Sequence, residues 1–148
     1  MFGSIVVGTD GSQTAATAVD EAVSLAKALG AKLEIVSAYE PVANDRLRDE
    51  RGQAPSDIQW MVGPREDVDN TLRAAAEAAA AAGVEVVATH ARQGDPADAI
   101  LDVAEEQGSD LIVVGNKGMT GAKRFLLGSV PNKVSHHAPC SVLIVRTT

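Results

Sequence analysis

The chain of 148 residues contains one cysteine, few aromatic residues and no long apolar run. A single cysteine, Cys140, cannot form an internal disulfide, which fits a reducing cytoplasm, and we expect it to be a small core residue before a strand. No segment approaches the ~18 consecutive apolar residues of a membrane span. The N-terminal M-F-G-S-I-V-V has no basic segment before its short apolar run, unlike a signal peptide.

Acidic residues are missing from the C-terminal quarter. The chain has a net charge of −7, but residues 111–148 hold five basic residues and no acid. Such an asymmetry suggests an anionic partner for this quarter. Five charges are too few for a nucleic-acid surface, and Phe125 is the one aromatic residue there that could stack on a base. A small polyanion fits better.

The hydrophobic pattern alternates between short apolar runs and helical periodicity, and several of the periodic segments end at glycine. It predicts strands over residues 4–9, 33–38, 84–90, 111–114 and 141–146, and helices over 14–29, 66–82, 96–107 and 130–137. Because the strands are continuous apolar runs, we expect a parallel sheet covered on both faces. The fold class is therefore α/β, with residues 1–148 forming a single domain around one doubly wound sheet of five parallel strands. Residues 40–64, polar and with three prolines, are expected to form a long loop excursion whose role the sequence does not indicate.

Two common phosphate-binding motifs are absent. The chain has neither G-x-x-x-x-G-K-[ST] nor G-x-G-x-x-G after its first strand. In doubly wound sheets, ligands bind beyond the carboxyl ends of the strands, where the strand order reverses. Polar turns with glycine follow the first strand, at Thr9-Asp10-Gly11-Ser12, and the fourth, from Gly115 onward.

The turn after the fourth strand has the features of a phosphate site. Gly115 and Gly118 would let the backbone approach an anion. Gly128 and Ser129 stand at a helix start, where unpaired N–H groups and the helix dipole favour phosphate. Pro131 lacks an N–H, which leaves the backbone of Gly128, Ser129 and Val130 as donors. Positive potential is expected from Lys117, Lys123, Arg124 and Lys133.

Each of these features also has a purely structural interpretation: the glycines could end a strand and cap a helix, and the basic residues could form a solvated face. The order of the glycines along the chain and the absence of acids favour phosphate. Asp10 leaves two alternatives open, since its carboxylate could accept hydrogen bonds from ribose hydroxyls or cap the next helix. Ser12 is the other candidate for that cap.

Taken together, these motifs resemble the universal stress protein family. The segment G-N-K-G-M-T-G-A-K-R-F-L-L-G-S-V contains the family's pattern of G, two residues, G, nine residues and G-[ST]. V-V-G-T-D-G-S near the N-terminus, G-D-P-A-D-A-I-L at 94–101 and H-A-P-C-S-V-L-I-V at 137–145 are also similar to it. The resemblance covers the chain except roughly residues 42–66.

The resemblance implies a flavodoxin-like sheet with strand order 3-2-1-4-5 that binds an adenine nucleotide. By this resemblance, Asp10 would hold the ribose. The backbone of Ala38 would contact the adenine, with Gly8 and Thr9 nearby, and Val114 and Gly115 would flank the base and the ribose. The phosphates would be held by Gly118, Gly128, Ser129 and Val130. Family members with the full signature typically bind ATP, and in this chain Asp10 alone could help hold Mg²⁺ through water. Pro131 departs from the family, where a hydroxyl residue often stands, so AMP and cyclic AMP remain alternatives. The family also implies a homodimer through the exposed edge of the last strand.

The sequence offers few residues suited to catalysis of phosphoryl transfer. Residues 111–148 have no carboxylate side chain to hold a metal for phosphoryl transfer. His136 and His137 fit a helix end better than a catalytic role, and nothing in the spacing places His90, Arg92 or Asp95 in the crevice. We therefore expect a nucleotide-binding sensor or carrier in the stress response. The alternatives are a slow hydrolase of the related adenine-nucleotide hydrolase class and a structural partner protein that leaves the pocket unused.

Overall fold

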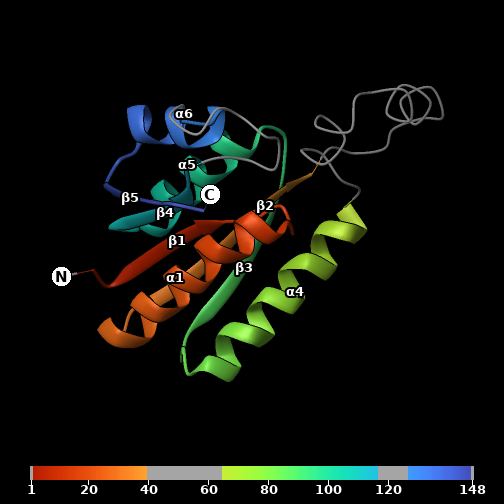
Figure 1. Cartoon of the computed structure of the whole chain (residues 1–148), viewed down its shortest axis with the longest axis vertical. Coiled ribbons are helices and arrows are strands. Elements are labelled where there is room, and N and C mark those ends of the chain that lie inside the picture. The colour runs from red at the N-terminus through yellow and green to blue at the C-terminus, as the bar shows by residue number, and fades with distance from the viewer. Residues whose placement is uncertain (1, 40–64, 117–126, 148) are drawn as a thin grey trace.

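The computed structural model describes residues 2–39, 65–116 and 127–147, and the loop excursion expected over 40–64 lies outside them. Strands and helices alternate along the described chain (Figure 1). In chain order they are β1 (Ser4–Gly8), α1 (Gln13–Leu29), β2 (Lys32–Tyr39), α4 (Arg65–Ala82), β3 (Val87–Gln93), α5 (Pro96–Gln107), β4 (Leu111–Gly115), α6 (Ser129–His137) and β5 (Ser141–Val145).

The five strands form one parallel sheet in the order β3-β2-β1-β4-β5, which confirms the predicted fold class and strand order. Strand β1 lies in the middle, with Val7 paired to Ile35 of β2 and to Val113 of β4. From β1 the chain builds outward first through β2 and β3, then through β4 and β5. The strand order therefore reverses between β1 and β4.

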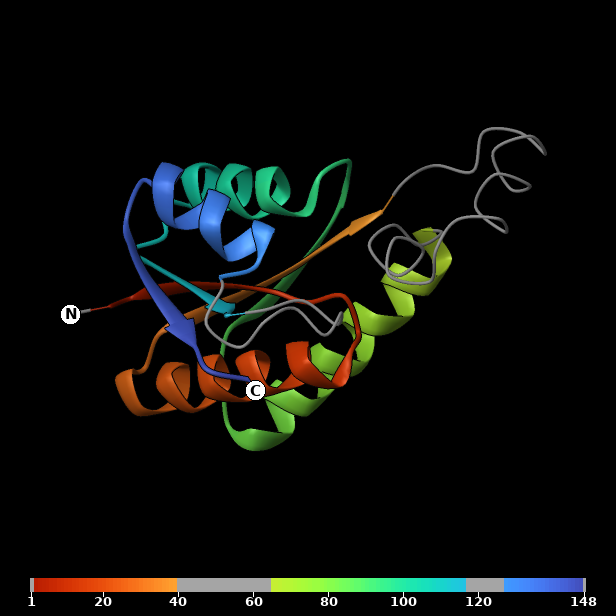
Figure 2. The ribbon, with the colours of Figure 1, turned by 45° about the horizontal axis from the view of Figure 1, so that its top comes forward.

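Helices cover both faces of the sheet, α1 and α4 on one side and α5 and α6 on the other (Figures 1 and 2). Each face of the sheet has its own hydrophobic core, and alternate residues of β1 point into one or the other. Ile5 and Val7 pack with α1 and α4, and Val6 packs with α5 and α6. Because both faces are buried, every interior position of β1 must be apolar. This accounts for the continuous apolar run in the sequence.

One strand boundary was predicted wrongly. The valines at 84, 86 and 87 suggested a strand over 84–90, but β3 spans Val87–Gln93. Val84 is buried, and its N–H donates to the Ala79 carbonyl at 3.2 Å, so it completes the end of α4 instead. The strand then continues through polar residues because β3 is an edge strand, where burial is incomplete.

Cys140 is partly buried just before β5 and packs against the core beside α5 and α6, as predicted. Burial raises the pKa of its thiol, which keeps the sulfur protonated and inert. Within the described residues, no helix is both long and apolar enough to cross a membrane.

Asp110 ties the N-terminal segment to the start of β4. Its carboxylate accepts hydrogen bonds from the Gly3 N–H at 2.9 Å and the Ser4 N–H at 3.0 Å. These two backbone donors, Gly3 above all, lower the pKa of Asp110 below its ordinary 3.8. A carboxylate of lowered pKa stabilises the fold above its unfolded pKa, and the stabilisation is lost as the pH falls through the folded pKa.

We expect Asp110→Asn to lower the urea midpoint of unfolding at neutral pH, because the neutral amide is a weaker acceptor for the two N–H groups. The difference from the unmodified chain should shrink as the pH falls from 3.8 through the lowered pKa of folded Asp110, where the native carboxylate also becomes neutral. Asp102→Asn, at an exposed position of α5, is the matched control and should show no such trend. A midpoint difference independent of pH would contradict this role of the Asp110 charge.

Candidate functional site

The candidate site lies where β1 and β4 end side by side, at the reversal of strand order (Figure 2). Since Val7 pairs with Val113, the next residues, Gly8 and Val114, are also neighbours at the carboxyl edge of the sheet. Strand β2 continues beyond them: Gly8 pairs with Val36, and Ala38 lies two residues farther on. These positions meet at the edge to which the sequence assigned the nucleotide.

Glycine at position 8 allows α5 to pack closely on the sheet. A Cβ atom at this position would lie 2.5 Å from the Ile100 Cδ1 atom, well inside van der Waals contact. Its φ angle is not in the left-handed region. The reason for glycine here is therefore space, since it lets the backbone of β1 and the side chain of α5 come together directly below the crevice.

Hydrogen bonds fix the loop after β1 and leave one oxygen of Asp10 unpaired. The Thr9 N–H donates to the Val36 carbonyl at 2.9 Å, and the Ser12 N–H donates to Asp10 Oδ1 at 2.8 Å. The cap of α1 is Ser12, whose hydroxyl accepts from the Ala15 N–H at 3.1 Å. Asp10 is therefore not the cap of α1. Its Oδ2 has no partner among the described residues and remains available to a ligand.

Gly11 couples this loop to α4. Its φ of +82° is in the left-handed region, and an added Cβ would lie 3.1 Å from the Thr71 hydroxyl oxygen. Both the backbone conformation and the close approach of α4 therefore exclude a side chain. The residue after Asp10 therefore lies close to a helix that is far along the chain.

Asn116 fastens the second turn and was missed by the sequence reasoning. Its N–H donates to the Val145 carbonyl at 2.8 Å, and its own carbonyl accepts from the Gly128 N–H at 2.9 Å. Its side-chain oxygen accepts from the N–H of Thr147 at 2.8 Å and from the hydroxyl at 3.0 Å. One residue thus joins the end of β4, the start of α6 and the segment after β5. Its place directly after Gly115 in the glycine signature was the signal that could have revealed it.

The first turn of α6 presents free backbone N–H groups. Gly128 is the N-cap and has no side chain to bond to the turn. The sequence predicted backbone donors at Gly128, Ser129 and Val130, but the Gly128 N–H is already bonded to Asn116. The N–H groups of Ser129 and Val130 have no partner among the described residues, and Pro131 has no N–H. The partly positive helix end therefore offers two donors together with the Ser129 hydroxyl.

Lys133 does not add free positive charge to this turn, contrary to the prediction. Its ammonium lies 2.8 Å from Asp98 Oδ1 and 3.4 Å from Asp95 Oδ2, at the start of α5. The hydrogen bond with Asp98 raises the pKa of Lys133. Lys133 therefore connects α6 to α5, and its charge is largely balanced there. Gly118, Lys117, Lys123 and Arg124 lie outside the described residues.

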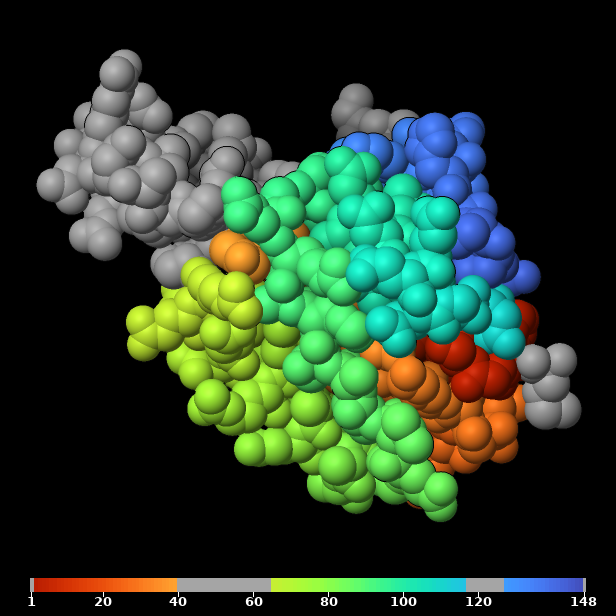
Figure 3. All heavy atoms as spheres, turned by 180° about the vertical axis from the view of Figure 1, so that it is seen from behind, coloured from red at the N-terminus to blue at the C-terminus, as the bar shows by residue number. Residues whose placement is uncertain are grey.

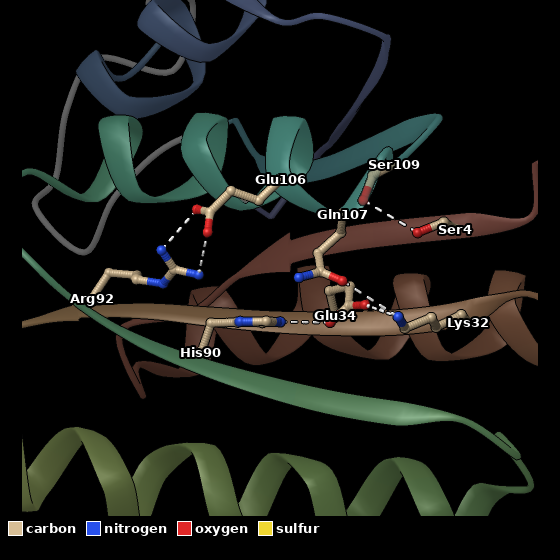
Figure 4. Close-up of polar contacts among 8 residues, drawn as sticks. All are labelled: Ser4, Lys32, Glu34, His90, Arg92, Glu106, Gln107 and Ser109. Atoms are coloured by element: carbon tan, nitrogen blue, oxygen red, sulfur yellow. Dashed lines mark hydrogen bonds and ion pairs between the residues drawn. The ribbon is translucent and has the colours of Figure 1, made fainter.

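The other polar side chains considered for catalysis are engaged in contacts within the fold (Figure 4). His90 Nε2 lies 2.6 Å from Oε2 of the fully buried Glu34, whose other oxygen lies 2.8 Å from the Lys32 ammonium. Arg92 forms a two-pronged ion pair with Glu106, at 2.7 and 3.2 Å. Asp95 caps α5.

His136 and His137 occupy the last turn of α6, at the opposite end of that helix from Ser129. A helix of this length places its ends about 12 Å apart. The two imidazoles are therefore remote from the free N–H groups of the first turn. No cluster of three or more metal-binding side chains occurs within the part of the chain that the structure describes.

Comparisons with known proteins agree on one family. The model of the universal stress protein family matches residues 1–146. Universal stress protein Rv1636 of Mycobacterium tuberculosis is 41% identical, with 99% of this chain and 98% of that one covered. Universal stress protein YxiE of Bacillus subtilis is 40% identical, with 99% and 100% covered. Among solved structures, a universal stress protein in complex with cyclic AMP is 36% identical with a TM-score of 0.75, covering 99% of this chain and 98% of that one.

We expect Asn116→Ala to lower the free energy of unfolding by about 1–3 kcal/mol, because two bonds from Thr147 lose their acceptor. Amide hydrogen exchange at Thr147 should also become faster. Asn132→Ala, an exposed position of α6 whose side chain makes no described hydrogen bond, is the matched control. Equal stability of the two variants in urea would show that Asn116 does not fasten the turn.

Proposed function

Because the chain belongs to the universal stress protein family, we propose that it binds an adenine nucleotide in the crevice beyond β1 and β4 and acts as a stress-response sensor or carrier with little or no hydrolysis. One observation carries the proposal. The groups with unused hydrogen-bonding capacity at this edge are complementary to a nucleotide: a carboxylate oxygen of Asp10 on one side, and the N–H groups of Ser129 and Val130 on the other. The relative bound to cyclic AMP supports it further.

The two sets of groups would contact different parts of the nucleotide. Asp10 Oδ2 is an acceptor without a partner among the described residues and suits the ribose hydroxyl donors. The N-terminus of α6 suits an anion, since its free N–H groups and dipole attract phosphate. The base would then rest against the backbone of Gly8, Thr9, Ala38, Val114 and Gly115, with Gly118 completing the phosphate loop.

The hydrogen-bond donors at the start of α6 bear on how many phosphates the bound nucleotide carries. With Gly128 bonded to Asn116 and Pro131 without an N–H, two backbone donors remain in the first turn. Two donors and one hydroxyl match a single phosphate group well. The glycine signature favours ATP, whereas this geometry also suits AMP or cyclic AMP. With ATP, Asp10 is the carboxylate that could hold Mg²⁺ through water.

A homodimer through β5 belongs to the same proposal. Strand β5 is an edge strand, and its Leu143 and Ile144 are 37% and 38% exposed. Large apolar side chains along an open sheet edge favour pairing with another strand. We propose a second copy of the chain as that partner and the cytoplasm as the location, with neither nucleic acid nor membrane involved.

We expect cyclic AMP, AMP or ATP at about one hundred times its dissociation constant to add about 2.7 kcal/mol to the free energy of unfolding. Asp10→Ala and Gly128→Glu should both abolish this gain, the first by removing the ribose acceptor and the second by placing a carboxylate where phosphate binds. Calorimetric titration with ATP, AMP, cyclic AMP and GTP ranks the ligands, and GTP should bind most weakly.

Asp20→Ala, on the exposed face of α1, is the matched control and should keep the full nucleotide-dependent gain. Thermal unfolding of each variant without nucleotide separates a folding defect from a binding defect. Unchanged stabilisation of both site variants would refute the assignment of the site. No stabilisation of the unmodified chain by any nucleotide would favour a structural partner protein.

Slow hydrolysis is the alternative function, and it has a direct measurement. Because His90, Arg92 and Asp95 are bonded within the fold, we expect phosphate release from ATP with Mg²⁺ far below one turnover per second. Multiple-turnover release at a kcat on the order of 1 s⁻¹ or more, lost in Asp10→Ala, would identify the chain as a hydrolase instead.

A further inference from the structure

A groove runs between α4 and β3 on the side of the sheet away from β5. It encloses about 490 Å³ and is open to solvent. Figure 3 shows β3 and α4 side by side on this face of the molecule. The lining residues come from these two elements alone: Arg65, Asp69, Leu72, Arg73, Ala76 and Glu77 from α4, and Thr89 and Ala91 from β3. None of them belongs to the nucleotide site.

The floor of this groove is an open sheet edge. Strand β3 pairs with β2 on one side, and no described strand pairs with its other side. Natural edge strands are commonly protected by lysine, proline or a bulge, but the sequence of β3, V-A-T-H-A-R-Q, contains neither lysine nor proline. The β3 side chains that line the groove, Thr89 and Ala91, are small. Another strand could therefore approach this edge without a steric barrier.

The wall of the groove carries charges of alternating sign. Arg65, Asp69, Arg73 and Glu77 follow one another at intervals of four residues along α4, and all four are exposed. Arg65 contacts the Tyr39 hydroxyl at 3.1 Å and Asp69 at 3.7 Å. Along α4 the wall therefore carries a positive, a negative, a positive and a negative charge in turn. The last two of these charges, those of Arg73 and Glu77, have no ion-pair partner among the described residues.

This order of charges is complementary to itself when reversed. An antiparallel copy of α4 places Arg65 opposite Glu77 of the partner subunit, and Asp69 opposite Arg73 of the partner subunit. A parallel copy would place like charges together. Strand β3 behaves in the same way, because an antiparallel pairing centred on His90 places Thr89 opposite Ala91 of the partner subunit. Both pairings form with the same partner copy if a single two-fold axis passes through the groove.

We propose that the α4–β3 groove is an interface with a second copy of this chain, formed by antiparallel pairing of the two β3 edges and by the charge rows of the two α4 helices. The self-complementary charge order is what selects an identical partner, since an unrelated partner would not need it. His90 does not obstruct the pairing, because its ring is bonded to Glu34 on the other face of the sheet. The interface is separate from the β5 edge and from the nucleotide site.

The test uses two single charge reversals at the centre of the row, Asp69→Arg and Arg73→Asp. Either variant alone places like charges opposite each other twice across the two-fold axis, so its apparent dissociation constant should rise at least about tenfold. In a 1:1 mixture, opposite charges again face each other, and association should return to that of the unmodified chain. Sedimentation velocity over a wide range of protein concentration measures each state, and added salt should weaken association of the unmodified chain.

Asp20→Arg and Lys27→Asp on the exposed face of α1 are matched controls, and both should associate like the unmodified chain. A second contact through β5 leaves the result readable: if the β5 edges also pair, the two contacts build a chain of subunits, and loss of the groove contact leaves the β5 dimer, whereas without β5 pairing it leaves the monomer. Thr89→Lys, which places a charge on the β3 edge, should dissociate the complex without touching α4 and serves as the second variant if a reversal unfolds the helix.

Unchanged association of both reversals, or a 1:1 mixture of folded variants that fails to recover it, would overturn the proposal. Loss of association in the α1 controls to the same degree would overturn it as well, since the effect would then follow net charge and not the groove. Association of Thr89→Lys equal to that of the unmodified chain would exclude pairing of the β3 edges.

Discussion

The burial of β1 is the constraint on which the rest of the molecule depends. This strand of five residues is paired on both edges and covered on both faces, so all of its backbone groups must be satisfied by parallel neighbours. The chain reaches these neighbours by crossing over opposite faces of the sheet, and right-handed connections then require the strand order to reverse beside β1. The loops after β1 and β4 are thereby directed apart, and a crevice opens between them. The position of the site is a consequence of how this one strand is paired.

Within that crevice, the groups that are already bonded define those that remain for a ligand. Ser12 takes the cap of α1, and Asn116 takes the Gly128 N–H and joins β4, α6 and the C-terminal segment. Within the described part of the crevice, a carboxylate oxygen of Asp10 and two N–H groups of α6 remain without a partner. The basic residue described near this turn, Lys133, is balanced by two carboxylates of α5. Under the proposed function, anion binding in the described part of the site would rest on oriented backbone dipoles more than on the charge of Lys133.

The two edge strands of the sheet differ in the polarity of their side chains, which affects how each edge could associate with another chain. The β5 edge presents the apolar side chains of Leu143 and Ile144, whereas the β3 edge is small and polar and lies beside a row of alternating charges. Apolar edges associate through burial, which depends little on salt, and charged rows associate through complementary fields that salt screens. Contacts at the two edges would accordingly respond differently to ionic strength, and neither edge overlaps the crevice proposed for the nucleotide.

The sequence by itself determined the fold class and most element boundaries, because apolar periodicity, the Ser12 and Asp95 caps and the terminal glycines act within a few residues of one another. Asp10 follows β1 and Ser129 begins α6, as the pattern predicted, whereas the strand order and the expected ligand came from the family resemblance. Tertiary structure decided the rest. The shift of β3, the engagement of Gly128 by Asn116 and the pairing of Lys133 with α5 all join residues distant along the chain. Which of these distant residues meet is decided by how the helices and strands pack, so a local sequence pattern could not predict these contacts.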